Sequence, residues 1–378
     1  MRIGIVCYPT FGGSGVVATE LGKELAMNGH EVHFITYDLP VRFDRFLSNL
    51  HYHEVRVSDY PLFDYQPYEL VLASRIVDVV KHEGLDILHV HYAIPHASAA
   101  YMAQQILKTE GIYIPYVTTL HGTDITLVGK DESFEPVITF AINQSDAVTA
   151  VSESLKADTY EHFAVKREIE VIPNFIDLNR YEGCSTEGVL KAFAPNGERL
   201  LLHTSNFRPV KRVEDVIEVF SRVRAEIPCK LLLAGDGPER PKIEALCRKL
   251  GTCDDVHFLG KLKNIEEVYS VADLFLLTSE TESFGLAALE AMASKVPVIS
   301  TNTGGIPEIN EHGVTGFLSN VGDTDDMVAN CLKLLTNPEL FAKFKEGAYQ
   351  KAKTFSEELI IPEYEKLYER TLASSRKN

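Results

Sequence analysis

Two glutamates with seven residues between them, Glu282 and Glu290, form a pair whose spacing could do chemistry. Paired carboxylates are typical of glycosidases, in which they flank one bond at roughly 5–9.5 Å. Eight residues of helix rise about 12 Å, which is too far for that role. The spacing favours two carboxylates that grip two parts of one long ligand. The alternative is an acid that complements a helix dipole and a second acid on the surface.

The residues around this pair predict a strand, a glycine-containing turn and a helix. The apolar run 274–277 is typical of a buried strand, and helical spacing begins after Gly285, with Leu286, Leu289 and Met292 on one face. The backbone N–H groups at a helix N-terminus form an anion site. An acid, an anion site and a second acid would match a sugar, a phosphate and a ribose.

A basic loop, SNFRPVKR at 205–212, follows a predicted strand in an otherwise acidic chain. Arg208 and Lys211 are candidates for neutralising a diphosphate, and plain surface charge is the alternative. Two further strand ends carry glycine turns, AGDGPER at 234–240 and FLGKL at 258–262. Through Gly235 and Leu262 these turns could present backbone groups to a base, or they could serve as turns only.

The N-terminal segment GGSGVVA at 12–18 contains a GxGxxA pattern, and Asp38 ends the next predicted strand. One interpretation is a dinucleotide site, with Asp38 on a ribose. A broader one is a helix N-terminus, including Gly13 and Ser14, that faces an anion or a sugar phosphate. A mere packing turn is the third.

Histidines follow two other predicted strands. His121, in HGTD, could donate to a sugar hydroxyl or to a developing charge, or could be a satisfied histidine. His89 and His91 share a strand face, but no cysteine or close acid completes a set of metal ligands. The DTD at 323–325 is placed to cap a helix rather than to hold a metal. The sequence therefore predicts no metal site.

Composition limits the class of partner. The 378 residues carry a net charge of −17, which argues against nucleic acid or an anionic membrane as partner. The run 3–7 is too short for a signal peptide, and no apolar run is long enough to span a membrane. Six scattered cysteines without a CxxC indicate free thiols in a reducing cytoplasm. Whether the chain forms a homo-oligomer stays open.

The order of the elements predicts an α/β protein with two doubly wound Rossmann-like domains. The first spans 1–173, with residues 40–68 as an irregular excursion. The second spans 174–355 and opens with a strand at 200–204. Helices follow at 340–354 and 358–370, the latter broken or kinked at Pro362. We expect ligands at the carboxyl ends of the strands, in a cleft between the domains.

In this order, these motifs resemble the retaining glycosyltransferases of family 4, which have the GT-B fold, over nearly the whole chain. Glu282 and Glu290 match the E-x7-E pattern of the family. The resemblance implies that Glu282 contacts the donor sugar and Glu290 the ribose. It also implies that the final helical segment, about 356–378, crosses back to the first domain. Backbone N–H groups for the diphosphate would come from the turn residues Ser283, Phe284, Gly285 and Leu286.

The chain departs from the family pattern at one position. An Arg usually stands five residues before the phosphate-binding Lys, and counting back from Lys211 this chain has Asn206. Because Asn carries no charge, either Arg208 substitutes for it or phosphate binding depends more on Lys211 and the helix dipole.

Five stretches are similar to those of family members that join N-acetylglucosamine to L-malate in bacillithiol synthesis: 1–22, 89–97, 118–129, 171–178 and 205–213. The resemblance implies UDP-GlcNAc as donor, L-malate as acceptor, retention of configuration and no metal cofactor. Glu282 and His121 would hold the sugar, while Lys211 would stabilise the departing UDP. The expected acceptor contacts are Gly12, Tyr92, Thr119, Thr123, Ser152 and Asn174.

Three alternatives remain. The first is a family-4 transferase with another small or lipid-linked acceptor. The second is an NAD-dependent oxidoreductase that uses the GxGxxA segment and Asp38. It leaves the motifs of the second domain unexplained. The third is a non-catalytic sugar-nucleotide-binding protein, against which the Glu pair and Lys211 argue.

Overall fold

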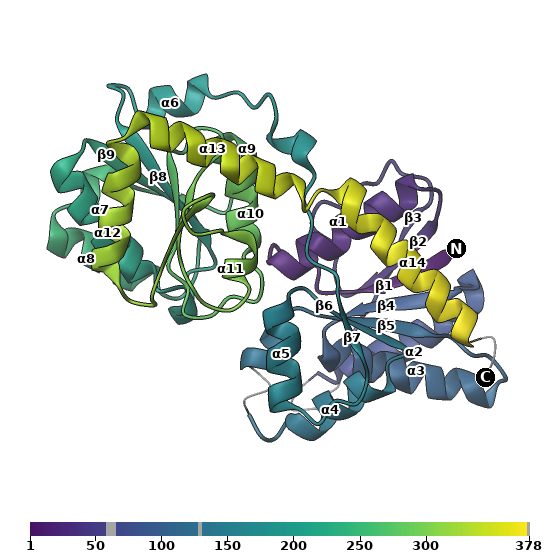
Figure 1. Ribbon diagram of the computed structural model, residues 1–378. Coiled ribbons are helices and arrows are strands. Elements are labelled where there is room, and N and C mark those ends of the chain that lie inside the picture. The colour runs from purple at the N-terminus through teal and green to yellow at the C-terminus, as the bar shows by residue number, and fades with distance from the viewer. Residues whose placement is uncertain (58–65, 128–130, 376–378) are drawn as a thin grey trace. The chain divides into compact units, whose positions relative to one another are not determined.

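The computed structural model describes residues 1–57, 66–127 and 131–375. The chain divides into two compact units, shown in Figure 1. Unit 1 comprises Met1–Asn174 with Glu357–Asn378, and unit 2 comprises Phe175–Ser356. Each boundary lies one residue from the position expected from the sequence.

Unit 1 is built on a parallel sheet of seven strands in the order β3-β2-β1-β4-β5-β6-β7. The strands Ile87–His91 and Tyr116–Leu120 are buried at every position, as strands covered on both faces must be. The strands are β1 (Arg2–Val6), β2 (Glu31–Thr36), β3 (Leu50–Glu54), β4 (Ile87–His91), β5 (Tyr116–Leu120), β6 (Ala147–Ala150) and β7 (Ile169–Val171).

Helices follow most of these strands. Ser152 caps α5, since its Oγ accepts a hydrogen bond from the backbone N–H of Leu155. The last helix returns from the end of unit 2 to pack on α1 and β5, as Figure 1 shows in yellow. The helices of unit 1 are α1 (Gly13–Met27), α2 (Tyr68–Glu83), α3 (Ser98–Thr109), α4 (Glu135–Gln144), α5 (Glu153–His162) and α14 (Glu357–Ser375).

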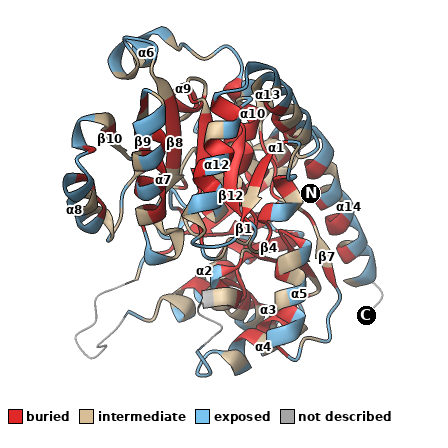
Figure 2. Cartoon of the chain, turned by 60° about the vertical axis from the view of Figure 1, so that its left-hand side comes forward, coloured by how far each residue is buried: buried red, intermediate tan, exposed pale blue. Residues whose placement is uncertain are grey.

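Unit 2 has a parallel sheet of six strands in the order β10-β9-β8-β11-β12-β13. Figure 2 shows strands of this sheet, such as β8 and β12, as buried, whereas much of α8 is exposed. The strands are β8 (Arg199–Ser205), β9 (Cys229–Gly235), β10 (Val256–Gly260), β11 (Leu274–Leu277), β12 (Val298–Thr301) and β13 (Gly316–Ser319). The helices are α6 (Glu187–Phe193), α7 (Val213–Glu226), α8 (Arg240–Leu250), α9 (Glu266–Tyr269), α10 (Leu286–Ala293), α11 (Ile306–Ile309), α12 (Thr324–Leu335) and α13 (Pro338–Lys353).

The predicted fold class is confirmed, since both units are parallel sheets flanked by helices. The prediction for residues 40–68 was wrong in part, because Leu50–Glu54 forms the edge strand β3. Residues 58–65 of this range lie outside the described residues. The sequence predicted a break or a kink at Pro362, and a break is excluded because α14 continues through this residue. Asp323 caps α12, as expected, by accepting from the N–H of Asp326.

Within the described residues, the model contains no helix that is both long enough and apolar enough to cross a bilayer.

Candidate functional site

The turn between β11 and α10 carries the predicted anion site. Gly285 precedes the helix with φ of 98°, a conformation that favours glycine. The Phe284 side chain is buried and packs edge-on against Phe355, which fixes the start of the helix. Ser283 and Leu286 are half-buried on either side. The N–H groups that open α10 therefore lie on an anchored turn.

Lys211 and Glu282 meet beside this turn. Lys211 Nζ donates to Glu282 Oε2 at 2.5 Å, and Ser279 Oγ donates to the same oxygen at 3.2 Å. The backbone of the Lys211 loop is tied to the end of β11, because Thr278 Oγ1 donates to the Lys211 carbonyl at 2.9 Å. The N–H of Glu280 likewise donates to Val210 O at 2.8 Å. The sheet thus holds an ammonium and a carboxylate together at the helix N-terminus.

Glu290 is held by a different set of groups. The hydroxyl of Tyr269 donates to Glu290 Oε2 at 3.0 Å and lies 2.7 Å from Thr204 Oγ1. Tyr269 is fully buried, and burial followed by the Glu290 charge keeps the pKa of its phenol well above the usual range. The phenol therefore stays a donor and fixes one carboxylate oxygen of Glu290.

The expected spacing of the glutamates rested on eight residues of helix, and this premise was wrong. The helix begins at Leu286, so only its first residues separate the turn from Glu290. What separates the two carboxylates is their surroundings, since Glu282 pairs with an ammonium and Glu290 with a phenol. This arrangement matches two contacts on one ligand.

The remaining predicted donor residues of unit 2 lie at neighbouring strand ends. Asn206 and Arg208 are exposed after β8, and Arg208 has no ion-pair partner within the described ranges. Gly235 ends β9, where a Cβ would overlap the carbonyl oxygen of Ser205. Leu262 is half-buried after β10. Arg208 is thus exposed on the same loop as Lys211.

Two glycines at this site were missed in the sequence. The N–H of Gly305 donates to the Glu282 carbonyl at 2.8 Å, and a Cβ on Gly304 would overlap that same oxygen. They follow β12 as a Gly-Gly pair, and a glycine-rich strand end was the signal that could have found them. The backbone of Glu282 therefore rests against a second strand end.

In unit 1, the N-terminus of α1 meets Tyr92. Gly12 and Gly13 are exposed at the start of the helix, and the Tyr92 hydroxyl donates to Ser14 Oγ at 2.6 Å. Burial raises the pKa of Tyr92 to about 12, so the phenol remains protonated. Gly13 and Ser14 were predicted to contact the donor, and they belong to a different unit from the other donor candidates.

His121 is half-buried at the end of β5, and its Nε2 lies 2.8 Å from Nδ1 of His91. Burial, and then the nearby His96, lower the pKa of His121 to about 3. His121 is therefore neutral at physiological pH, and can donate or accept a hydrogen bond without carrying charge. His89 and His91 share a strand face, as expected, with rings stacked 4.5 Å apart.

Asp124 is a positioning residue that was left out of the predicted site. Its Oδ2 accepts from the N–H of Ala93 at 2.7 Å and its Oδ1 from Gly122 at 3.2 Å. Burial raises the pKa of Asp124 to about 6, against the effect of these backbone bonds. The carboxylate joins the turns that follow β4 and β5, which carry Tyr92 and His121.

Two of the predicted acceptor contacts are buried. Thr119 is fully buried, and its hydroxyl lies 2.6 Å from His89 Nε2 and 2.7 Å from Thr149 Oγ1. Ser152 is also fully buried and caps α5. Both side chains therefore hold neighbouring strands and helices together in the interior of unit 1. Thr123 is exposed, while Asn174 is 6% exposed with no hydrogen-bond partner on Oδ1 among the described residues.

The comparisons with known families cover both units. The model for glycosyltransferase family 4 matches residues 11–180, and that for glycosyl transferases group 1 matches residues 190–351.

Similar proteins include an N-acetyl-alpha-D-glucosaminyl L-malate synthase from Bacillus anthracis, 49% identical over 97% of this chain and 96% of the relative. A D-inositol 3-phosphate glycosyltransferase from Thermobispora bispora is 26% identical over 91% of this chain and 86% of the relative. Among solved structures, HepE from Anabaena in complex with UDP and glucose has a TM-score of 0.82 at 20% identity, covering 99% of this chain and all of the other.

The alignment with the Bacillus anthracis relative covers nearly the whole chain, and the two family models match one unit each. The chain belongs to the family-4 glycosyltransferases with the GT-B fold.

Proposed function

We propose that this glycosyltransferase moves N-acetylglucosamine from UDP-GlcNAc to the hydroxyl of L-malate, with retention, as the first step of bacillithiol synthesis. The proposal is supported by 49% identity to a relative that bears the name of an N-acetyl-alpha-D-glucosaminyl L-malate synthase. Family membership decides against the oxidoreductase alternative. Asp38, its candidate ribose contact, has an oxygen that accepts from the N–H of Leu39 at 2.7 Å.

The Lys211–Glu282 pair at the start of α10 is the observation that carries the proposal. A departing nucleoside diphosphate develops negative charge, and an ammonium beside a helix N-terminus stabilises that charge. Glu282 would bind sugar hydroxyls once the diphosphate takes over the ammonium. Arg208, exposed on the same loop, supplies the second positive charge in place of the family arginine that Asn206 replaces.

Retention fits the separate surroundings of the two glutamates. The charge of Glu282 is neutralised by Lys211. Glu290 accepts a hydrogen bond from Tyr269, and this position suits it to bind a ribose hydroxyl. We assign neither a nucleophilic role. The acceptor hydroxyl attacks C1 from the face that the diphosphate leaves, and a diphosphate oxygen takes its proton. The protein then contributes positioning and charge stabilisation, with no metal required.

The acceptor would bind to unit 1. Ser14 and Tyr92 present hydroxyls at the N-terminus of α1, whose N–H groups suit a malate carboxylate. His121 is neutral and half-buried, so it can hydrogen-bond a sugar hydroxyl without attracting the diphosphate. The six cysteines form no disulfide, which agrees with the proposed reducing cytoplasm.

The test is release of UDP from UDP-GlcNAc, measured with L-malate in the presence of EDTA. We expect release that depends on L-malate, and much weaker release with D-malate, whose hydroxyl is misplaced relative to the carboxylates. UDP release that does not depend on malate but requires D-inositol 3-phosphate would show that the acceptor is the inositol phosphate and not malate. Release that is abolished by EDTA and restored by a divalent cation would overturn the metal-free mechanism.

A further inference from the structure

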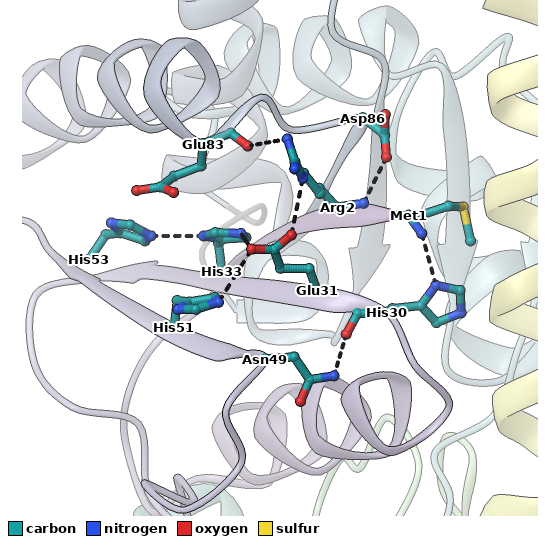
Figure 3. A network of polar contacts seen from close by, with 10 residues as sticks. All are labelled: Met1, Arg2, His30, Glu31, His33, Asn49, His51, His53, Glu83 and Asp86. Carbon is teal, nitrogen blue, oxygen red and sulfur yellow. Dashed lines mark hydrogen bonds and ion pairs between the residues drawn. The ribbon is translucent and has the colours of Figure 1, made fainter.

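A cluster of histidines and acids lies at the edge of the unit 1 sheet, on strands β2 and β3 (Figure 3). The register pairs His33 with His51 and Ile35 with His53, so these side chains share one face. Glu31 lies two residues before His33 and faces the same way. His33 Nε2 is 3.8 Å from Glu31 Oε1, and His51 Nε2 is 3.5 Å from that oxygen.

The hydrogen bonds of His33 determine which of its nitrogens is free. Its Nδ1 lies 2.9 Å from His53 Nε2, which is a hydrogen bond between two rings. Its Nε2 is buried and has no hydrogen-bond partner among the described residues. His33 itself is only 1% exposed, so the surrounding water cannot serve that nitrogen.

Nε2 of His33 faces a carboxylate oxygen of Glu31. If Nδ1 carries the proton and donates it to His53, then Nε2 and Glu31 Oε1 are two acceptors at 3.8 Å with no proton between them. Such a pair of acceptors is satisfied by a cation.

We propose that Glu31, His33 and His51 bind a divalent transition-metal ion of the zinc class. Two imidazoles and one carboxylate form a set of ligands that zinc takes, and bonds of about 2.0–2.2 Å place tetrahedral ligands roughly 3.3–3.6 Å apart. The observed 3.5 and 3.8 Å need a small contraction, and the stacked rings of His33 and His51 must turn so that both Nε2 atoms face one ion. Magnesium and calcium prefer oxygen ligands and fit this set poorly.

Neighbouring groups already orient the ligands. His33 Nδ1 is hydrogen-bonded to His53 Nε2, and a second hydrogen bond on the other ring nitrogen is usual for a metal-bound histidine. Arg2 Nε donates to Glu31 Oε2 at 3.0 Å, which leaves Oε1 turned toward the histidines (Figure 3). Glu31 and His51 are 40% and 38% exposed at their side chains, so an ion can enter from solvent.

The proposed site is separate from the glycosyltransferase reaction. Glu31 and His51 lie at the amino ends of β2 and β3, whereas His121 and Tyr92 follow the carboxyl ends of β5 and β4. Since β3 is the edge strand and pairs only with β2, a bound ion would fasten this strand to the sheet. Its effect is on the stability of unit 1 rather than on chemistry.

The experiment titrates chelator-treated protein with Zn²⁺ by calorimetry, and with Co²⁺ as a spectroscopic probe of tetrahedral coordination. We expect one equivalent to bind and to raise the Tm. His51→Gln should lower the affinity at least tenfold, because it removes one ligand from a half-exposed position without disturbing the core. Two matched variants should bind as the parent does: His82→Gln, from an exposed histidine–aspartate pair, and Glu83→Gln.

Three results would overturn the proposal. The first is no saturable binding of either ion by the parent. The second is equal affinity in His51→Gln and His82→Gln, which places the ion elsewhere. The third is loss of binding in Glu83→Gln with binding kept in His51→Gln, which assigns the ion to the overlapping set of His33, His53 and Glu83. UDP release should be unchanged in every variant, so failure here does not touch the proposed reaction.

Discussion

Lys211 and Glu282, 71 positions apart in the chain, are joined by a hydrogen bond of 2.5 Å between Nζ and Oε2. Their side chains are 20% and 18% exposed, so the ion pair is partly shielded from water. Each residue rests on a separate strand end, β8 for the lysine loop and β11 for the glutamate turn. The pair therefore keeps a positive charge in place before any ligand arrives.

Replacing Lys211 by Ala should reduce kcat/KM about 100-fold, or ~2.7 kcal/mol, because the leaving diphosphate loses its nearest cation. The measurement is UDP release at limiting UDP-GlcNAc. Lys249→Ala, at an exposed position in the last turn of α8, is the control and should match the parent. A fall of less than about threefold in Lys211→Ala would show that the lysine does not stabilise the leaving group.

Tyr269→Phe should weaken UDP binding about tenfold while kcat changes little, because it removes the hydrogen bond from the Tyr269 hydroxyl to Glu290 and keeps the carboxylate. The readouts are the Kd for UDP and the split between KM and kcat. Tyr349→Phe is a matched control, since its hydroxyl also donates to a glutamate, Glu182, at an exposed position. Equal Kd values for UDP in the two variants would show that Tyr269 does not position Glu290 for UDP binding.

Much of the fold could be predicted because several of its strands are continuous apolar runs. Leu274–Leu277 shows this pattern, and its strand bounds were predicted without error. The edge strand β3 was missed because its sequence, LHYHE, alternates polar and apolar residues and is only partly buried. A covered central strand needs apolar residues on both faces, whereas an edge strand does not.

The sequence indicated individual candidate residues of the donor site, but it did not indicate which of them contact one another. Lys211 and Glu282 each carried a local signal, yet nothing in the sequence indicates that they pair across 71 positions. Gly304 was missed because its role, close approach to the Glu282 carbonyl, exists only in the folded chain. The burial of Thr119 could not be predicted either, because a hydroxyl near a strand end can point into the interior.

Acid should destabilise unit 2 through His203. Burial lowers the pKa of His203 to about 4, although its hydrogen bond to the Leu276 carbonyl opposes this. In the unfolded chain, His203 therefore binds a proton below about pH 6.5, whereas in the folded chain it binds one only below about pH 4. The stabilising contribution of the neutral ring is present above pH 6.5 and is lost as pH falls through this window.

Urea unfolding between pH 7.5 and 4.5 measures this contribution. In the parent, His203 should contribute at most about 1.4 kcal/mol per pH unit to the change in the free energy of unfolding with pH. His203→Gln should remove this contribution. The same variant at pH 8 is the control, because there the difference from the parent reports packing and hydrogen bonds alone. A slope identical in parent and variant would exclude His203 as a source of acid sensitivity.

Gly304→Ala should disable the donor site while the fold survives. A Cβ at this position would overlap the Glu282 carbonyl oxygen, so the turn that carries Glu282 must shift. Gly313→Ala separates this clash from backbone strain, because Gly313 also has positive φ but a Cβ there meets nothing within 4 Å. We expect Gly313→Ala to cost about 1 kcal/mol of stability and keep its activity. Gly304→Ala should lose more than tenfold in kcat/KM and in UDP affinity, measured below the Tm of both variants. Equal activity in the two variants would mean that the turn adapts to the added methyl group and that its position does not control donor binding.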